Sequence, residues 1–198
     1  MIGVASAEAS LILRCKENDE AAFNEIVERH KIKVYTYIMR MVGNSQDAED
    51  LAQETFVRAY LSIRSFEGRA SLTTWLFRIA TNLCIDRARR SHTRQMIQTA
   101  SLDDVDEYGA SYTDDLPDGR YEPQVRVLQD ELKTELEAAI AQLPDKLRMV
   151  ILLHDLEGLQ YDEIAEVLHC PLGTVKSRIF NARQVLREQL SEYLYGSD

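Results

Sequence analysis

Six arginines interleaved with three aromatic residues form the part of the chain best suited to binding an anionic ligand. The arginines are Arg69, Arg78, Arg87, Arg89, Arg90 and Arg94, and the aromatic residues are Phe66, Trp75 and Phe77. Only Glu67 and Asp86 oppose this positive charge. Arginine neutralises phosphates and aromatic rings stack on unpaired bases, so the segment suits a single strand of nucleic acid. Packing in a helical core is an equal alternative for Trp75 and the favoured one for Phe77.

A second group of cations lies in residues 161–187, where two helical patterns flank a short break. The first helix places Ile164, Ala165 and Leu168 on one face, and residues 169–173 interrupt the pattern. The apolar face of the second helix comprises Val175, Ile179, Ala182, Leu186 and Leu190. The opposite, polar face comprises Ser177, Phe180, Asn181 and Gln184. The flanking cations are Lys176, Arg178, Arg183 and Arg187. This pattern predicts a helix-turn-helix whose second helix reads base edges while its cations contact phosphates. An ordinary helical hairpin with a charged face is the alternative, and the compact turn and segregated cations favour DNA binding.

Helices account for the rest of the strongly patterned sequence. Apolar residues at helical spacing predict helices over about 20–42, 47–62 and 72–90. Gly43 and Asn44 supply the stop and the cap between the first two. The pattern resumes after residue 128, and Pro144 begins a further helix. No alternating, turn-bounded pattern predicts a strand, so the expected fold is all-α.

An acidic stretch separates the two basic segments. Residues 101–123 contain eight carboxylates and one arginine, which is −7 of the total net charge of −10. Glycine and proline recur there and apolar periodicity fails, so we expect a flexible acidic linker. The expected organisation is a helical domain at 1–95, a linker at 96–123 and a helix-turn-helix domain at 124–198. Local basic patches determine nucleic-acid binding, so the negative total does not exclude it.

Composition and cysteine usage favour a cytoplasmic protein. The three cysteines are far apart in sequence and odd in number, as expected for reduced thiols. No apolar run is long enough for a membrane span, and the first residues lack the pattern of a secretory signal. We therefore expect no membrane insertion.

Three other classes of function fit the sequence less well than DNA binding does. An enzyme is disfavoured because the sequence shows no phosphate loop and no catalytic pair of carboxylates. His30 lies on an apolar helix face and fits a core histidine better than a catalytic base. The spacing of His154, His169 and Cys170 does not match that of zinc ligands. We expect no catalytic residues, no metal and no cofactor. A stand-alone regulator would carry a sensing domain in place of the arginine and aromatic segment. A helical adaptor would leave the clustered arginines unexplained.

Three long motifs, in order, resemble the extracytoplasmic-function (ECF) branch of the sigma-70 family. NSQDAEDLAQETFVRAY (residues 44–60) resembles region 2.2, and FEGRASLTTWLFRIATNLCIDRARR (residues 66–90) resembles regions 2.3 and 2.4. LPDKLRMVILLHDLEGLQYDEIAEVLHCPLGTVKSRIFNAR (residues 143–183) resembles region 4. The resemblance covers nearly the whole chain outside the linker. It implies a factor that binds core RNA polymerase, recognises promoters and aids their melting.

The resemblance also implies sites and partners. Region 2.2 would bind the clamp helices of the β′ subunit through Asp47, Glu49, Asp50, Gln53, Glu54 and Arg58. The unpaired minus-ten strand would be bound by Phe66, Arg69, Ser71, Leu72, Trp75, Arg78, Asn82, Arg87, Arg89 and Arg90. Duplex DNA at the minus-thirty-five element would be bound by Thr174, Lys176, Ser177, Arg178, Phe180, Asn181, Arg183 and Gln184. Region 4 would also contact the flap of the β subunit, and an anti-sigma factor is an expected partner.

One position departs from the commonest family pattern. Members often have arginine where this chain has Asn181. Arginine pairs with guanine in the major groove, whereas asparagine pairs with adenine. We therefore expect an altered base preference at the minus-thirty-five element.

Overall fold

Every regular secondary-structure element in the described part of the chain is helical. A computed structural model describes the backbone of residues 2–98 and 123–195 and the side chains of residues 8–90 and 131–191. Its elements are α1 (Ile2–Lys16), α2 (Glu20–Val42), α3 (Ser45–Ser62), the 3-10 turn η1 (Ile63–Ser65), α4 (Leu72–Gln98), α5 (Pro123–Gln142), α6 (Asp145–Ile151), the π-helical turn η2 (Leu152–Leu156), α7 (Tyr161–Leu168) and α8 (Leu172–Tyr195). The all-α prediction is confirmed. The expected acidic linker falls almost wholly in residues 99–122, outside the described residues.

The caps between the first helices follow the sequence prediction. Gly43 ends α2 with a left-handed φ of 71°, and its N–H donates to the Met39 carbonyl oxygen. The Asn44 side chain then accepts from the Asp47 N–H at 3.0 Å and begins α3. An L-residue with a side chain would be strained at the Gly43 conformation, so glycine is the residue expected there.

Helices α2, α3 and α4 form the N-terminal bundle around a core of large side chains. Tyr37 and Phe77 are each 1% exposed, and their rings meet edge-on with centroids 5.2 Å apart. Burying a side chain of this size contributes roughly 1.5–3 kcal/mol. The Tyr37 hydroxyl is hydrogen-bonded to the Thr81 hydroxyl at 2.8 Å, which satisfies the polar group in the core. Burial raises the pKa of Tyr37, so this hydroxyl stays protonated.

Two features of the N-terminal half differ from the sequence prediction. Helix α4 continues to Gln98, past the expected end at Arg90, because the polar residues that follow are compatible with a helix even without an apolar face. Helix α1 was not predicted. Within its described side chains, Leu11 and Cys15 are buried, and α1 packs against α2 and η1.

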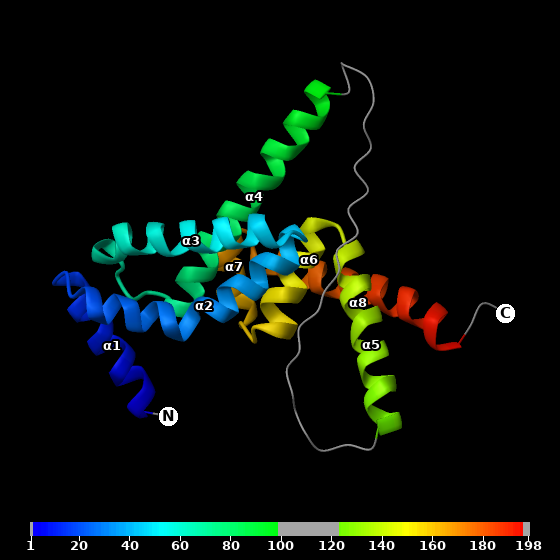
Figure 1. Cartoon of the computed structure of the whole chain (residues 1–198), viewed down its shortest axis with the longest axis horizontal. Helices are drawn as coiled ribbons and strands as arrows, with labels where there is room; N and C mark the ends of the chain where they lie inside the picture. Colours follow the sequence, from blue (N-terminus) through cyan, green and yellow to red (C-terminus); the bar gives the residue numbers. More distant parts are fainter. Residues whose placement is uncertain (1, 99–122, 196–198) are drawn as a thin grey trace.

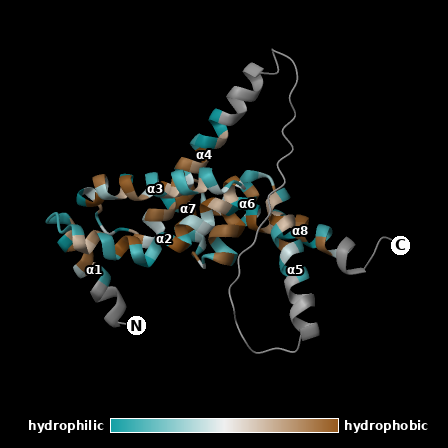
Figure 2. Cartoon of the chain, viewed as in Figure 1, coloured by the Kyte–Doolittle hydropathy of each residue, from teal (hydrophilic) through white to brown (hydrophobic). Residues whose placement is uncertain are grey.

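The two halves pack against each other. Helix α7 lies on α4, and α6 and η2 contact α2 (Figure 1). Apolar residues concentrate where these helices meet (Figure 2). In the same view the C-terminal part of α4 and the N-terminal part of α5 project away from this centre (Figure 1). None of the helices in the described part of the chain combines the length and hydropathy that a membrane span requires.

Glu157, directly after η2, is a half-buried carboxylate at the junction of the halves. Burial is the largest influence on its pKa and raises it, while Lys33 and Arg40 of α2 act in the opposite direction. A carboxyl group whose pKa is raised by folding favours the folded state most when it is protonated. That contribution is complete below the pKa of the unfolded chain and is lost as pH rises through the folded pKa.

Glu157→Gln is therefore expected to gain stability relative to the wild type as the pH rises. The amide cannot ionise, so the variant avoids the cost of burying a charge. Urea unfolding of both proteins between about pH 4 and about pH 8 measures the difference, with Glu166→Gln on the exposed side of α7 as the control for losing one carboxylate. A difference that shrinks with rising pH would contradict the stated pKa direction.

Candidate nucleic-acid interface

The C-terminal unit has the geometry of a helix-turn-helix. Helix α7 begins with a cap in which the Glu163 carboxylate accepts from the Gln160 N–H at 2.9 Å. It ends at His169, whose left-handed φ of 48° turns the chain, and the Cys170 N–H donates to the Ala165 carbonyl oxygen at 3.1 Å. Helix α8 starts three residues after His169, at Leu172, so Leu172 and Gly173 belong to the helix rather than to the expected break. The compact turn fixes α8 against α7.

Helix α8 buries one face and exposes the other, as its periodicity predicts. Its apolar face comprises the buried residues Val175, Ile179, Ala182 and Leu186. The opposite face exposes the residues expected to read bases, which are Ser177, Phe180, Asn181 and Gln184, and beside them Lys176, which is expected to contact a phosphate. Phe180 is 66% exposed, although its ring is large and apolar. A thymine methyl group in the major groove is a suitable partner for such a ring.

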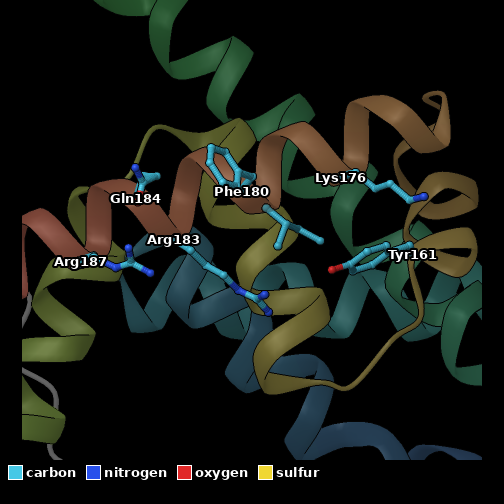
Figure 3. A pocket seen from close by; sticks show the side chains of 7 residues that line it. Tyr161, Lys176, Phe180, Arg183, Gln184 and Arg187 are labelled. Atoms are coloured by element: carbon cyan, nitrogen blue, oxygen red, sulfur yellow. The ribbon is translucent and has the colours of Figure 1, made fainter.

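A shallow pocket of about 380 Å³ lies along α8 beside the N-terminus of α7. Its lining comprises Tyr161, Lys176, Ile179, Phe180, Arg183, Gln184 and Arg187. Lys176 lies near Tyr161 at one end and Arg187 at the other (Figure 3). Arg187 was expected as one of the cations that contact phosphates, whereas Tyr161 was not among the predicted DNA contacts. A row of cations of this kind suits a phosphate backbone.

Arg183 is oriented by a partner that the sequence did not reveal. Its guanidinium forms two hydrogen bonds with the Asp155 carboxylate, one of them from Nε to Oδ2 at 3.3 Å. The hydrogen bond to Asp155 is the main cause of a raised pKa at Arg183, which keeps the group charged. In Figure 3 the Arg183 side chain extends from α8 toward the segment that precedes α7. Asp155 therefore determines where this cation lies beside the pocket.

The remaining predicted minus-thirty-five residues occupy intermediate positions. Thr174 and Arg178 are partly buried in the first two turns of α8. The Thr174 carbonyl oxygen accepts from the Ser177 hydroxyl at 3.0 Å. These residues border the exposed face without forming its centre.

The predicted minus-ten residues divide into a buried and an exposed set. Phe66 and Trp75 are each 7% exposed, Leu72 is 2% exposed, and the Phe66 and Trp75 rings lie 5.0 Å apart. These three side chains are therefore part of the core of the N-terminal half. The exposed residues are Arg69, Ser71, Asn82, Arg87, Arg89 and Arg90, and Arg78 is half-buried.

Three exposed arginines of the N-terminal half form ion pairs with nearby carboxylates. Arg69 pairs with Glu67 at 2.6 Å, and both side chains remain largely exposed. Arg89 pairs with Asp86 at 3.1 Å on α4, and Arg87 pairs with Asp47 of α3. Exposed pairs of this kind contribute little to stability, so phosphates can compete for the arginines.

Helix α3 presents the residues expected to bind polymerase. Glu49, Asp50 and Gln53 are exposed, and Glu54 pairs with Arg58 at 2.7 Å. Three further side chains on this helix are exposed although apolar or aromatic: Val57 at 46%, Tyr60 at 41% and Leu61 at 75%. Their exposure was missed because an apolar residue in a helical pattern is ordinarily assigned to the core.

Comparisons with known proteins agree with this geometry. The family model described as Sigma-70 region 2 matches residues 26–94, and that described as Sigma-70, region 4 matches residues 133–186. The ECF RNA polymerase sigma factor SigW of Bacillus subtilis is 40% identical over 183 residues, which cover 91% of this chain and 95% of the relative. The chain belongs to the ECF branch of the sigma-70 family. It is therefore an RNA polymerase sigma factor, and its α2–α4 bundle and its helix-turn-helix correspond to regions 2 and 4.

Two further relatives support this assignment. The ECF RNA polymerase sigma-E factor of Haemophilus influenzae is 35% identical over 184 residues, which cover 92% of this chain and 95% of the relative. A solved structure of the sigma factor RpoE in complex with the anti-sigma factor NepR, from Bartonella quintana, aligns with a TM-score of 0.64 at 25% identity. The alignment covers 85% of this sigma factor and 96% of that chain. In the part of this sigma factor that the structure describes, no group of three His, Cys, Asp or Glu side chains could hold a metal ion.

Proposed function

We propose that this sigma factor binds core RNA polymerase through the exposed polar face of α3 and reads promoters with two separate surfaces. Region 4 reads the minus-thirty-five duplex through the exposed face of α8, and region 2 binds the unpaired minus-ten strand through Asn82, the loop of residues 67–71 and the arginines of α4. The observation that carries the proposal is the exposure of the polar face of α8 opposite an apolar face that is buried from Val175 to Leu186 and half-buried at Leu190. Such a helix can enter a major groove without unfolding its own domain.

The proposed function also implies how the protein acts, in which cell compartment it works and which regulator binds it. The protein acts by binding rather than by catalysis and uses no cofactor, and it works in the cytoplasm, where polymerase and promoters lie. An anti-sigma factor is a proposed partner, because RpoE of Bartonella quintana forms a complex with one. We place the domain boundaries near residues 95 and 124, and the separate family models over residues 26–94 and 133–186 support a division of the chain between them.

A promoter-selection experiment tests this function. Bacterial core polymerase, a promoter library and the purified chain are combined, and transcripts are sequenced. Transcripts that depend on the chain and share two elements support the proposal. A chain that binds duplex DNA alone but never associates with core polymerase would instead be a stand-alone regulator.

Asn181→Arg is expected to change the preferred minus-thirty-five sequence at one or two positions. Asn181 is exposed on the reading face of α8, and exchanging an adenine-pairing for a guanine-pairing side chain alters discrimination by about 1–3 kcal/mol per position. The measurement is promoter selection with each protein. Lys176→Ala is the control, because losing a phosphate contact should weaken all sequences alike and reduce the salt dependence. An unchanged preference in Asn181→Arg would show that α8 reads DNA with another face.

A further inference from the structure

An acidic residue lies beside the cations of the surface proposed to bind the minus-thirty-five duplex. Asp155 belongs to the π-helical turn η2, and its carboxylate accepts two hydrogen bonds from the Arg183 guanidinium of α8. A carboxylate repels the phosphates of DNA, so its charge alone would weaken binding at this surface. The position of Asp155 is explained if the residue acts on Arg183 rather than on DNA.

The backbone on both sides of Asp155 is fixed by hydrogen bonds and by burial. The Gly158 N–H donates to the His154 carbonyl oxygen at 3.1 Å. The Leu159 N–H donates to the Leu153 carbonyl oxygen at 3.0 Å, and both leucine side chains are buried. The His154 ring donates from Nδ1 to the Leu159 carbonyl oxygen at 2.9 Å. These contacts give the Asp155 carboxylate a defined place next to α8.

The pair with Asp155 leaves donors of Arg183 available to a ligand. Asp155 accepts from Nε at 3.3 Å and from Nη2, which share one edge of the planar guanidinium. This group has more N–H donors than one carboxylate can accept, so the donors of Nη1, outside that edge, can still bind a phosphate oxygen. The Arg183 side chain is 49% exposed and lines the pocket with Tyr161 and Lys176. In Figure 3 the Tyr161 hydroxyl points along this pocket toward Arg183.

Holding Arg183 in advance lowers the cost of binding a phosphate. A long side chain loses rotational freedom when it contacts a ligand, and this cost weakens affinity by about two- to tenfold for each side chain that must be ordered. The two side chains of the pair are partly exposed, 34% at Asp155, so the pair itself contributes little to stability. We therefore expect loss of Asp155 to affect DNA binding more than folding.

We propose that Asp155 is a positioning residue that holds Arg183 in place for a backbone phosphate of the minus-thirty-five duplex. This role rests on the function proposed above, since it presupposes that α8 binds that duplex. Phosphates carry no sequence information, so the effect of Asp155 extends to all sequences alike. A carboxylate that instead competed with DNA for Arg183 would have the opposite effect on affinity.

Asp155→Ala tests this role in the holoenzyme formed by the full-length chain and core polymerase. Fluorescence anisotropy measures closed-complex affinity for a promoter fragment obtained in the promoter selection. Asp155→Ala should bind about two- to tenfold more weakly than the wild type, although it removes a negative charge near DNA. Asp155→Asn keeps an acceptor oxygen for Arg183 and should bind more tightly than Asp155→Ala. Asp162→Ala is the matched control, because Asp162 is an exposed carboxylate of α7 whose loss should leave affinity unchanged or increased.

The same exchange in an Arg183→Ala background separates positioning from a structural role. Arg183→Ala should itself weaken binding, and adding Asp155→Ala should weaken it no further, because no guanidinium remains to be positioned. An equal loss in both backgrounds, with a lowered melting temperature, would mean that Asp155 only stabilises the domain and would overturn the proposal. Tighter binding by Asp155→Ala alone, or full affinity in Arg183→Ala, would overturn it as well.

Failure of the proposed function gives a different result. A wild-type holoenzyme that selects and binds no promoter would overturn the proposed function together with this role of Asp155. A wild-type holoenzyme that binds its promoter, with Asp155→Ala behaving like Asp162→Ala, would overturn the role of Asp155 alone.

Discussion

Asn82→Ala is expected to slow promoter opening by about one to two orders of magnitude while leaving closed-complex formation nearly unchanged. Asn82 is exposed on α4 between the buried residues Thr81 and Leu83, so its side chain is available to an extruded base. Losing a stacking or hydrogen-bonding partner of such a base costs roughly 1–3 kcal/mol. If the contact is made in the opening transition state, that cost appears directly in the rate. Permanganate reactivity of minus-ten thymines and transcript yield measure the effect.

A premelted promoter separates this role from a structural one. With the strands already unpaired, Asn82→Ala should recover part of its activity but not the base preference. Asn24→Ala is the matched control, because Asn24 is also an exposed asparagine inside a helix and the exchange alters helix propensity equally. Equal losses on duplex and premelted templates, together with a lowered melting temperature, would mean that Asn82 only stabilises the fold.

The local elements were predictable because their signals are local. The apolar period of α8 correctly placed Val175, Ile179, Ala182 and Leu186 inside and Phe180 outside. The end of α2 followed from a single glycine and its neighbouring cap. The family resemblance added what periodicity lacks, which is a function for each surface. The assignment of individual DNA and polymerase contacts remains a prediction.

The packing of region 4 on region 2 could not be predicted from periodicity, because its contacts join residues far apart in the sequence. Thr74 and Glu163 lie 89 positions apart. Each is an ordinary residue for the first turn of a helix, so neither one indicates a distant partner in the sequence. Asp155, which orients Arg183, is a polar residue in a turn and resembles any solvated carboxylate in the sequence. Helix α1 was not predicted; among its described side chains, residues 8–16, Leu11 and Cys15 are the buried ones, and two residues are too few to give a distinct period.

Trp75 is a residue whose role the sequence left open and whose burial in the structure leads to a testable prediction. Trp75 was equally suited to stacking on DNA and to core packing, and here it is 7% exposed against the Phe66 ring. We therefore expect its main effect to be on the stability of region 2. Trp75→Ala should lower the free energy of unfolding by about 3–5 kcal/mol, as measured by urea denaturation.

Trp75→Phe distinguishes a supporting ring from a DNA contact. Phenylalanine retains an apolar ring against Phe66, so the free energy of unfolding should fall much less than in Trp75→Ala, and the rate of promoter opening should stay close to that of the wild type. Trp75→Ala should weaken opening and closed-complex formation together, because both depend on a folded region 2. If Trp75→Phe were as stable as the wild type but opened promoters as slowly as Asn82→Ala, the indole ring would contact the unpaired strand itself. Region 2 would then have to expose Trp75 on binding DNA, and the buried position seen here would belong to the free chain alone.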